Sequence, residues 1–74
     1  MMSVNETISS CCRNIEEADT REQRLKEVDK IKSCCSELPE EQGNEVMACC
    51  TRIETTDSKE EVSQEVQKIR SCCS

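Results

Sequence analysis

The residues with the most distinctive chemistry in this sequence are its cysteines, which number eight in 74 residues. They occur only as adjacent pairs, the doublets Cys11/Cys12, Cys34/Cys35, Cys49/Cys50 and Cys72/Cys73. Thiols in such numbers form disulfide bonds, hold soft metal ions as thiolates, or act as redox nucleophiles. The spacing of the doublets and the rest of the composition discriminate among these three chemistries.

The doublet spacing disfavours metal binding and redox catalysis. Structural zinc sites use C-x₂₋₄-C spacing, often with histidine, and this chain has no histidine and no such spacing. Redox sites favour C-x-x-C at a helix N-terminus. Carboxylate pairs such as Glu16 and Glu17 lack a predicted pocket that could shift their pKa values. We therefore expect no enzymatic activity, no catalytic residue, no cofactor and no metal ligand, and we assign all eight cysteines to disulfides.

The composition explains why disulfides are needed. The chain has no aromatic residue, only twelve Leu, Ile and Val residues, and a net charge of −6, a balance that is otherwise typical of disorder. No stretch is long and apolar enough for a membrane-spanning helix. Acidic and basic residues are interspersed, without the basic stripe of a nucleic-acid binder. We expect a single domain that inserts into no membrane and binds no nucleic acid.

The cysteine doublets mark an internal repeat. The doublets are separated by 21, 13 and 21 residues, and a shift of 38 places Ile15 on Ile53 and Val28 on Val66. We divide the domain, 1–74, into repeat one at 4–36, a turn at 37–44 that contains Pro39 and Gly43, and repeat two at 45–74. A duplication of this kind gives two copies of one supersecondary unit that bury their apolar faces together.

Each repeat has the periodicity of an amphipathic helix. Apolar residues and cysteines recur at steps of three, four and seven, separated by good helix formers. The apolar stripe thins near Asp19 and Asp57, where the next residues, Thr20 and Ser58, have the chemistry of helix N-caps. Each long helix is therefore either broken at these positions or continuous through solvated residues. The predicted class is all-α.

One register of an antiparallel helical hairpin matches all four doublets. Position numbers that sum to 84 pair the doublet 11/12 with 72/73 and the doublet 34/35 with 49/50, and place the turn beside Gly43. Pairing the doublets within a repeat would instead centre a turn near Gln23, in a helix-forming segment. We therefore predict a disulfide-stapled hairpin of two long arms. Neighbouring helical residues point about 100° apart, so the exact partners within the doublets stay open.

The expected function is that of a small secreted ligand. The first residues have neither the basic nor the apolar run of a secretory leader, so this is either a chain whose leader was removed or an intracellular protein with reduced thiols. The cysteine content favours the first. We expect a venom toxin-like or pheromone-like peptide that binds a receptor or ion channel, as a monomer or homodimer. The alternatives are an intracellular copper or zinc thiolate protein and a structural disulfide hairpin.

The predicted layout is similar to that of the twin-cysteine helical hairpins of the mitochondrial intermembrane space. Both have two antiparallel helices joined at two levels by disulfides. The C-x₉-C spacing of that family is absent from this sequence. The resemblance therefore covers the layout alone and assigns no residue.

Overall fold

A computed structural model describes residues 3–73 of the chain, and most of these residues are helical, as predicted. Its elements are the α-helices α1 (Val4–Glu17), α2 (Arg21–Cys34), α3 (Glu40–Thr55) and α4 (Lys59–Cys73), with the 3₁₀ helix η1 (Cys35–Glu37) after α2. Met1, Met2 and Ser74, which belong to the predicted domain 1–74, lie outside the described residues. No strand occurs between residues 3 and 73, and the all-α class is confirmed.

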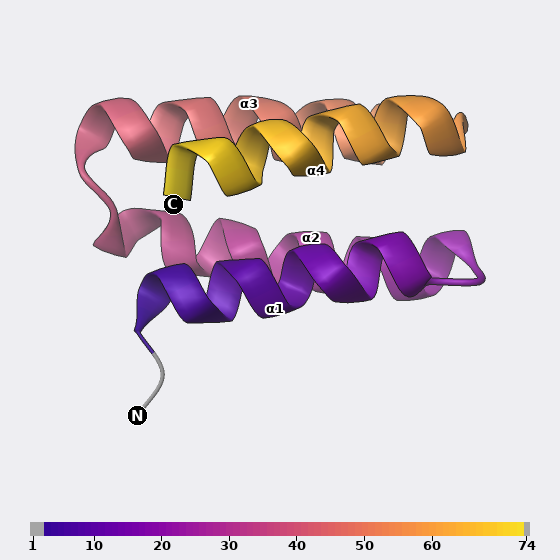
Figure 1. The fold of residues 1–74 in the computed structure, drawn as a ribbon, viewed down its shortest axis with the longest axis horizontal. Helices are drawn as coiled ribbons and strands as arrows, with labels where there is room; N and C mark the ends of the chain where they lie inside the picture. Colours follow the sequence, from indigo (N-terminus) through magenta and orange to yellow (C-terminus); the bar gives the residue numbers. More distant parts are fainter. Residues whose placement is uncertain (1–2, 74) are drawn as a thin grey trace.

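Each repeat forms a hairpin of its own (Figure 1). The chain reverses between α1 and α2 at residues 18–20, and between α3 and α4 at residues 56–58. The two unbroken arms of a single long hairpin are therefore not formed. The breaks lie at Asp19 and Asp57, the positions at which the cap residues suggested them.

Local hydrogen bonds explain why the helices stop at these positions. The Thr20 side chain caps α2 by accepting a hydrogen bond from the Gln23 backbone N–H, at 3.2 Å. The Gln23 side chain in return accepts from the Asp19 backbone N–H, also at 3.2 Å. This reciprocal pair satisfies donors that a new helix leaves free, so the sequence favours a fresh helix start over a continuous helix.

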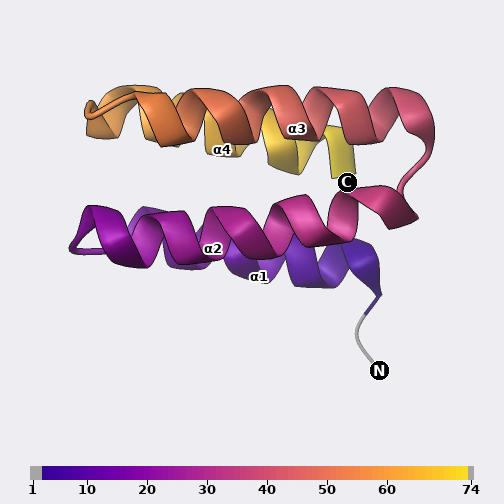
Figure 2. The ribbon, with the colours of Figure 1, turned by 180° about the vertical axis from the view of Figure 1, so that it is seen from behind.

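The two hairpins pack against each other as a four-helix bundle (Figures 1 and 2). Helix α1 contacts α2 and α4, and α3 contacts α4 and α2, so that each helix borders two others. The buried aliphatic core lies between them and consists of Ile8, Ile15, Val28, Ile31, Val46, Ile53, Val62, Val66 and Ile69. The arrangement of two hairpins also differs from the two-helix layout of the intermembrane-space proteins. None of the helices within residues 3–73 is long and apolar enough to cross a bilayer.

The predicted turn at 37–44 is shorter in the structure. Helix α3 already begins at Glu40, directly after Pro39, so Gly43 is helical rather than part of the turn. Gly43 is buried against η1, and a Cβ atom there would lie 3.0 Å from the Cys35 carbonyl oxygen. Gly43 is therefore needed for the close approach of two backbones, and not for a turn conformation.

Candidate functional site

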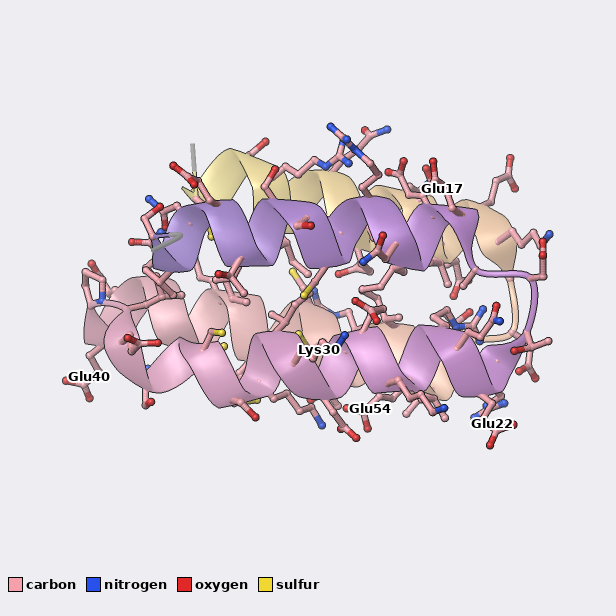
Figure 3. The ribbon with its side chains drawn as sticks, turned by 90° about the horizontal axis from the view of Figure 1, so that it is seen from below. Glu17, Glu22, Lys30, Glu40 and Glu54 are labelled. Carbon is pink, nitrogen blue, oxygen red and sulfur yellow. The ribbon has the colours of Figure 1, made fainter. Side chains whose placement is uncertain are left out.

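All eight cysteines lie in the bundle core or against it. Five are buried, namely Cys11, Cys12, Cys35, Cys49 and Cys50. Cys34, Cys72 and Cys73 are partly buried and pack against the same core. Figure 3 shows the sulfur atoms between the helices, toward the end of the bundle that holds Glu40 and away from Glu17 and Glu22. Each cysteine is present as a free thiol.

The first cysteine of the doublets in α1 and α3 faces the second helix of its own hairpin. The Cys11 thiol hydrogen-bonds to the carboxylate of Glu27 on α2. In the second repeat, the Cys49 thiol makes the equivalent hydrogen bond to Glu65 on α4. Burial and the neighbouring carboxylate both raise the pKa of each thiol.

The second cysteine of the same doublets faces the other hairpin. Cys12 on α1 lies close enough to Arg70 and Cys73 of α4 for their charges to interact, and burial raises its pKa to about 12. Cys50 on α3 interacts in the same way with Cys35, and burial followed by that interaction raises its pKa to about 12. Cys12 and Cys50 are fully buried.

Two carboxylates that were not singled out from the sequence, Glu27 and Glu65, are central to these contacts. Glu65 is 7% exposed and accepts hydrogen bonds from Arg52 and Lys68, each at 3.2 Å. Burial opposes its ionisation, but the hydrogen bonds from Lys68, Arg52 and Cys49 outweigh it and lower the Glu65 pKa. The shared position of Glu27 and Glu65 in both repeats was the available signal, although repetition alone does not reveal burial.

Glu27 has partners at the corresponding positions of the first repeat. It accepts hydrogen bonds from Asn14 and from Lys30, each at 3.1 Å. The hydrogen bond from Asn14 is the main reason that its pKa is lowered, while partial burial acts in the opposite direction. Asn14 therefore occupies the place that Arg52 has in the second repeat.

The end of α4 carries a further thiol–carboxylate contact. The Cys72 thiol donates a hydrogen bond of 2.9 Å to Glu45 of α3, and this bond, followed by burial, raises the Cys72 pKa to about 11. An open groove of about 680 Å³ passes over this contact between α3 and α4. Its lining includes the side chains of Gln64, Gln67 and Lys68 together with Ala48. A hollow of this size was not expected from the sequence.

The buried thiols are poor nucleophiles and poor metal ligands, because their surroundings keep them protonated. The thiolate is the form that attacks electrophiles and binds metal ions, and the raised pKa values of Cys12, Cys50 and Cys72 keep them protonated at neutral pH. Within residues 3–73, no three cysteine, aspartate or glutamate side chains gather closely enough to hold a metal ion.

All eight cysteines are free thiols, so the pairing of the doublet 11/12 with 72/73 and of the doublet 34/35 with 49/50 stays a prediction. Between the hairpins, Cys12 interacts electrostatically with Cys73, and Cys50 with Cys35. Within the hairpins, Cys11 interacts electrostatically with Cys34, and Cys72 with Cys49.

Comparison with protein-family models, curated proteins and solved structures gives no significant match for this chain.

Proposed function

We propose that this chain is a secreted, non-enzymatic, disulfide-rich helical peptide that acts by binding a target protein, such as a receptor or ion channel. The observation that carries the proposal is the position of the cysteines. All eight are packed in or against one core in a chain of 74 residues. Oxidation of thiols so placed would join elements of the bundle to one another.

The size of the core supports the oxidised state. Between residues 3 and 73 the fully buried aliphatic side chains are Ile and Val only, with no aromatic residue in the chain. A core of this size in so short a chain rarely supplies more than about 3–5 kcal/mol. A disulfide adds about 2–4 kcal/mol by restricting the unfolded chain. Secreted domains of this size are typically stabilised in this way.

Rigidity and charge support binding to a protein. A cross-linked bundle has little conformational entropy to lose when it associates with a partner. The net charge of −6 favours a target whose binding surface is basic, because opposite potentials accelerate encounter. The contacting face is one of the exposed, charged helix faces.

Redox equilibration followed by mass measurement tests the proposal. The purified chain is equilibrated with reduced and oxidised glutathione, then with Zn²⁺ or Cu⁺ under anaerobic conditions. A secreted disulfide protein reaches a mass about 8 Da below that of the reduced chain, binds neither ion and has no alkylatable thiol. A chain that keeps eight thiols under these conditions and takes up either ion is a metal-thiolate protein, which contradicts the proposal.

A further inference from the structure

The sequence contains one acceptor motif for N-linked glycosylation, Asn5-Glu6-Thr7. The other two asparagines, Asn14 and Asn44, have no serine or threonine two positions further on. A motif of three residues also arises by chance, so its place in the fold decides whether a glycan can be attached there.

The Asn5 side chain is exposed and unengaged in the first turn of α1. Within residues 3–73 it takes part in no hydrogen bond, whereas the Asn14 side chain donates to Glu27 at 3.1 Å. The start of α1 is capped by Ser3, whose side chain accepts a hydrogen bond from the Glu6 backbone N–H at 3.2 Å. A group attached to the Asn5 amide nitrogen therefore displaces no contact of the bundle.

The internal repeat shows that the space around Asn5 is specific to the first repeat. A shift of 38 places Asn5 on Gly43, which is buried where a Cβ atom would lie 3.0 Å from the Cys35 carbonyl oxygen. Asn5 instead lines an open hollow of about 210 Å³ between the start of α1 and the end of α4, which lie at the same end of the bundle (Figure 1). A position with no room for a side chain in the second repeat thus has room for a large substituent in the first.

We propose that Asn5 carries an N-linked oligosaccharide whose first sugar lies at the hollow between α1 and α4. The inference rests on the proposed function, because this modification belongs to secreted proteins. A glycan is bulky and strongly hydrated, so it would cover this end of the bundle. The target protein would then contact a helix face away from the start of α1.

The oligosaccharide comes from a lipid pyrophosphate donor. A bond forms between the Asn5 amide nitrogen and the anomeric carbon of the first sugar, and the bond from that carbon to the pyrophosphate oxygen breaks. The lipid pyrophosphate leaves with the electron pair, and the amide nitrogen loses one proton. No oxidant or reductant takes part.

The transfer precedes the folding of α1. In a turn, an asparagine side chain bonds to the backbone two residues further on, which brings Asn5 beside Thr7. In α1 the Thr7 N–H and the Thr7 hydroxyl both donate to the Ser3 carbonyl, at 3.0 and 3.1 Å, and residues two apart in a helix point about 200° apart. A helix of 14 residues is marginal in water by itself, so the segment is available until the bundle packs.

Expression of the full chain behind a secretory leader in eukaryotic cells tests the proposal. The exported chain should carry one glycan, and its removal by peptide-N-glycosidase should leave an aspartate at position 5 in the peptide map. Asn5→Gln and Thr7→Ala should lose the glycan completely. Thr7→Ser keeps the acceptor motif and is the matched control, so it should keep the glycan, as should Asn14→Gln.

The possible results separate this inference from the proposed function. An exported chain with no alkylatable thiol and no glycan would overturn the inference and leave the proposed function intact. A glycan that persists in N5Q would also overturn the inference, because the acceptor would then lie elsewhere. A chain that is retained in the cells with eight alkylatable thiols and no glycan would overturn both.

Discussion

At the scale of single residues, the most informative feature is the carboxylate that each repeat places opposite its first cysteine, which is buried as Glu65 in the second repeat and partly buried as Glu27 in the first. Glu65 is nearly buried yet fully hydrogen-bonded, by Arg52, Lys68 and Cys49. Burial of a charged carboxylate costs little free energy as long as its hydrogen-bond partners are present. A conformation that separates the carboxylate from these partners is destabilised, because the buried charge is then unpaired. Glu65 therefore helps to specify how α4 packs on α3.

Replacement of Glu65 by glutamine should lower the free energy of unfolding at pH 7 by about 1 kcal/mol. The loss is no larger because Arg52 and Lys68 are largely exposed, so water can solvate their charges once the carboxylate is gone. The lowered pKa of Glu65 stabilises the fold above its ordinary value of 4.5, and this contribution is lost as the pH falls through the lower, folded value. Urea unfolding of E65Q and the parent should therefore differ at pH 7 and converge in acid.

The substitution E60Q is the matched control, because Glu60 is an exposed carboxylate in the same helix. Its stability should fall by only about 0.3 kcal/mol at pH 7, because Glu60 is exposed in the first turn of α4, where an acidic side chain interacts weakly with the helix dipole. A loss as large in E60Q as in E65Q would show that the effect comes from net charge and not from the buried contacts.

At the scale of elements, the helix caps decide where the chain reverses. Cap chemistry at Thr20 and Ser58 was readable in the sequence, and the structure places helix starts directly after both residues. Sequence reasoning still favoured one long hairpin, because it assumed that doublets joined by disulfides lie at the same height. In the structure Cys11 lies beside Glu27 rather than level with Cys34, so a turn at residues 18–20 becomes possible without a break near Gln23.

Removal of the first cap should destabilise the fold. Thr20→Ala deletes the oxygen that accepts the Gln23 N–H, which typically costs about 1 kcal/mol. Thr51→Ala is the control, because the Thr51 hydroxyl only bonds back to the Met47 carbonyl within α3. Chemical denaturation should rank T20A below the parent and T51A at or above it. Equal midpoints for T20A and the parent would mean that the cap does not fix the turn.

Gly43 should resist substitution even though it is helical. Alanine is normally better than glycine inside a helix by about 1 kcal/mol, but a Cβ at Gly43 would lie 3.0 Å from the Cys35 carbonyl oxygen. G43A should therefore lower the thermal midpoint, whereas N44A, at the exposed next position of α3, should raise it slightly. A G43A variant that gains as much as N44A would contradict the close packing of α3 on η1.

At the scale of the whole molecule, duplication explains both what was predictable and what was not. The repeat and the helical class follow from local patterns in the sequence, which also offered breaks near Asp19 and Asp57 as one of two alternatives. The packing of the two hairpins could not be predicted from the sequence, because equal spacers between the doublets fit both one long hairpin and a bundle of two short hairpins. The burial of Glu65 was also out of reach, since it depends on which helix lies opposite.

The whole molecule favours covalent cross-links. Its aliphatic core is small, and its eight cysteines are buried or half-buried in or against that core. The most direct test is a redox titration, in which the chain is equilibrated with glutathione mixtures of known potential, capped with an alkylating reagent and weighed intact. Structural disulfides should leave the chain fully oxidised at about −250 mV, near the cytosolic poise. A chain that still carries eight alkylated cysteines at about −180 mV, the poise of the secretory pathway, would contradict the account.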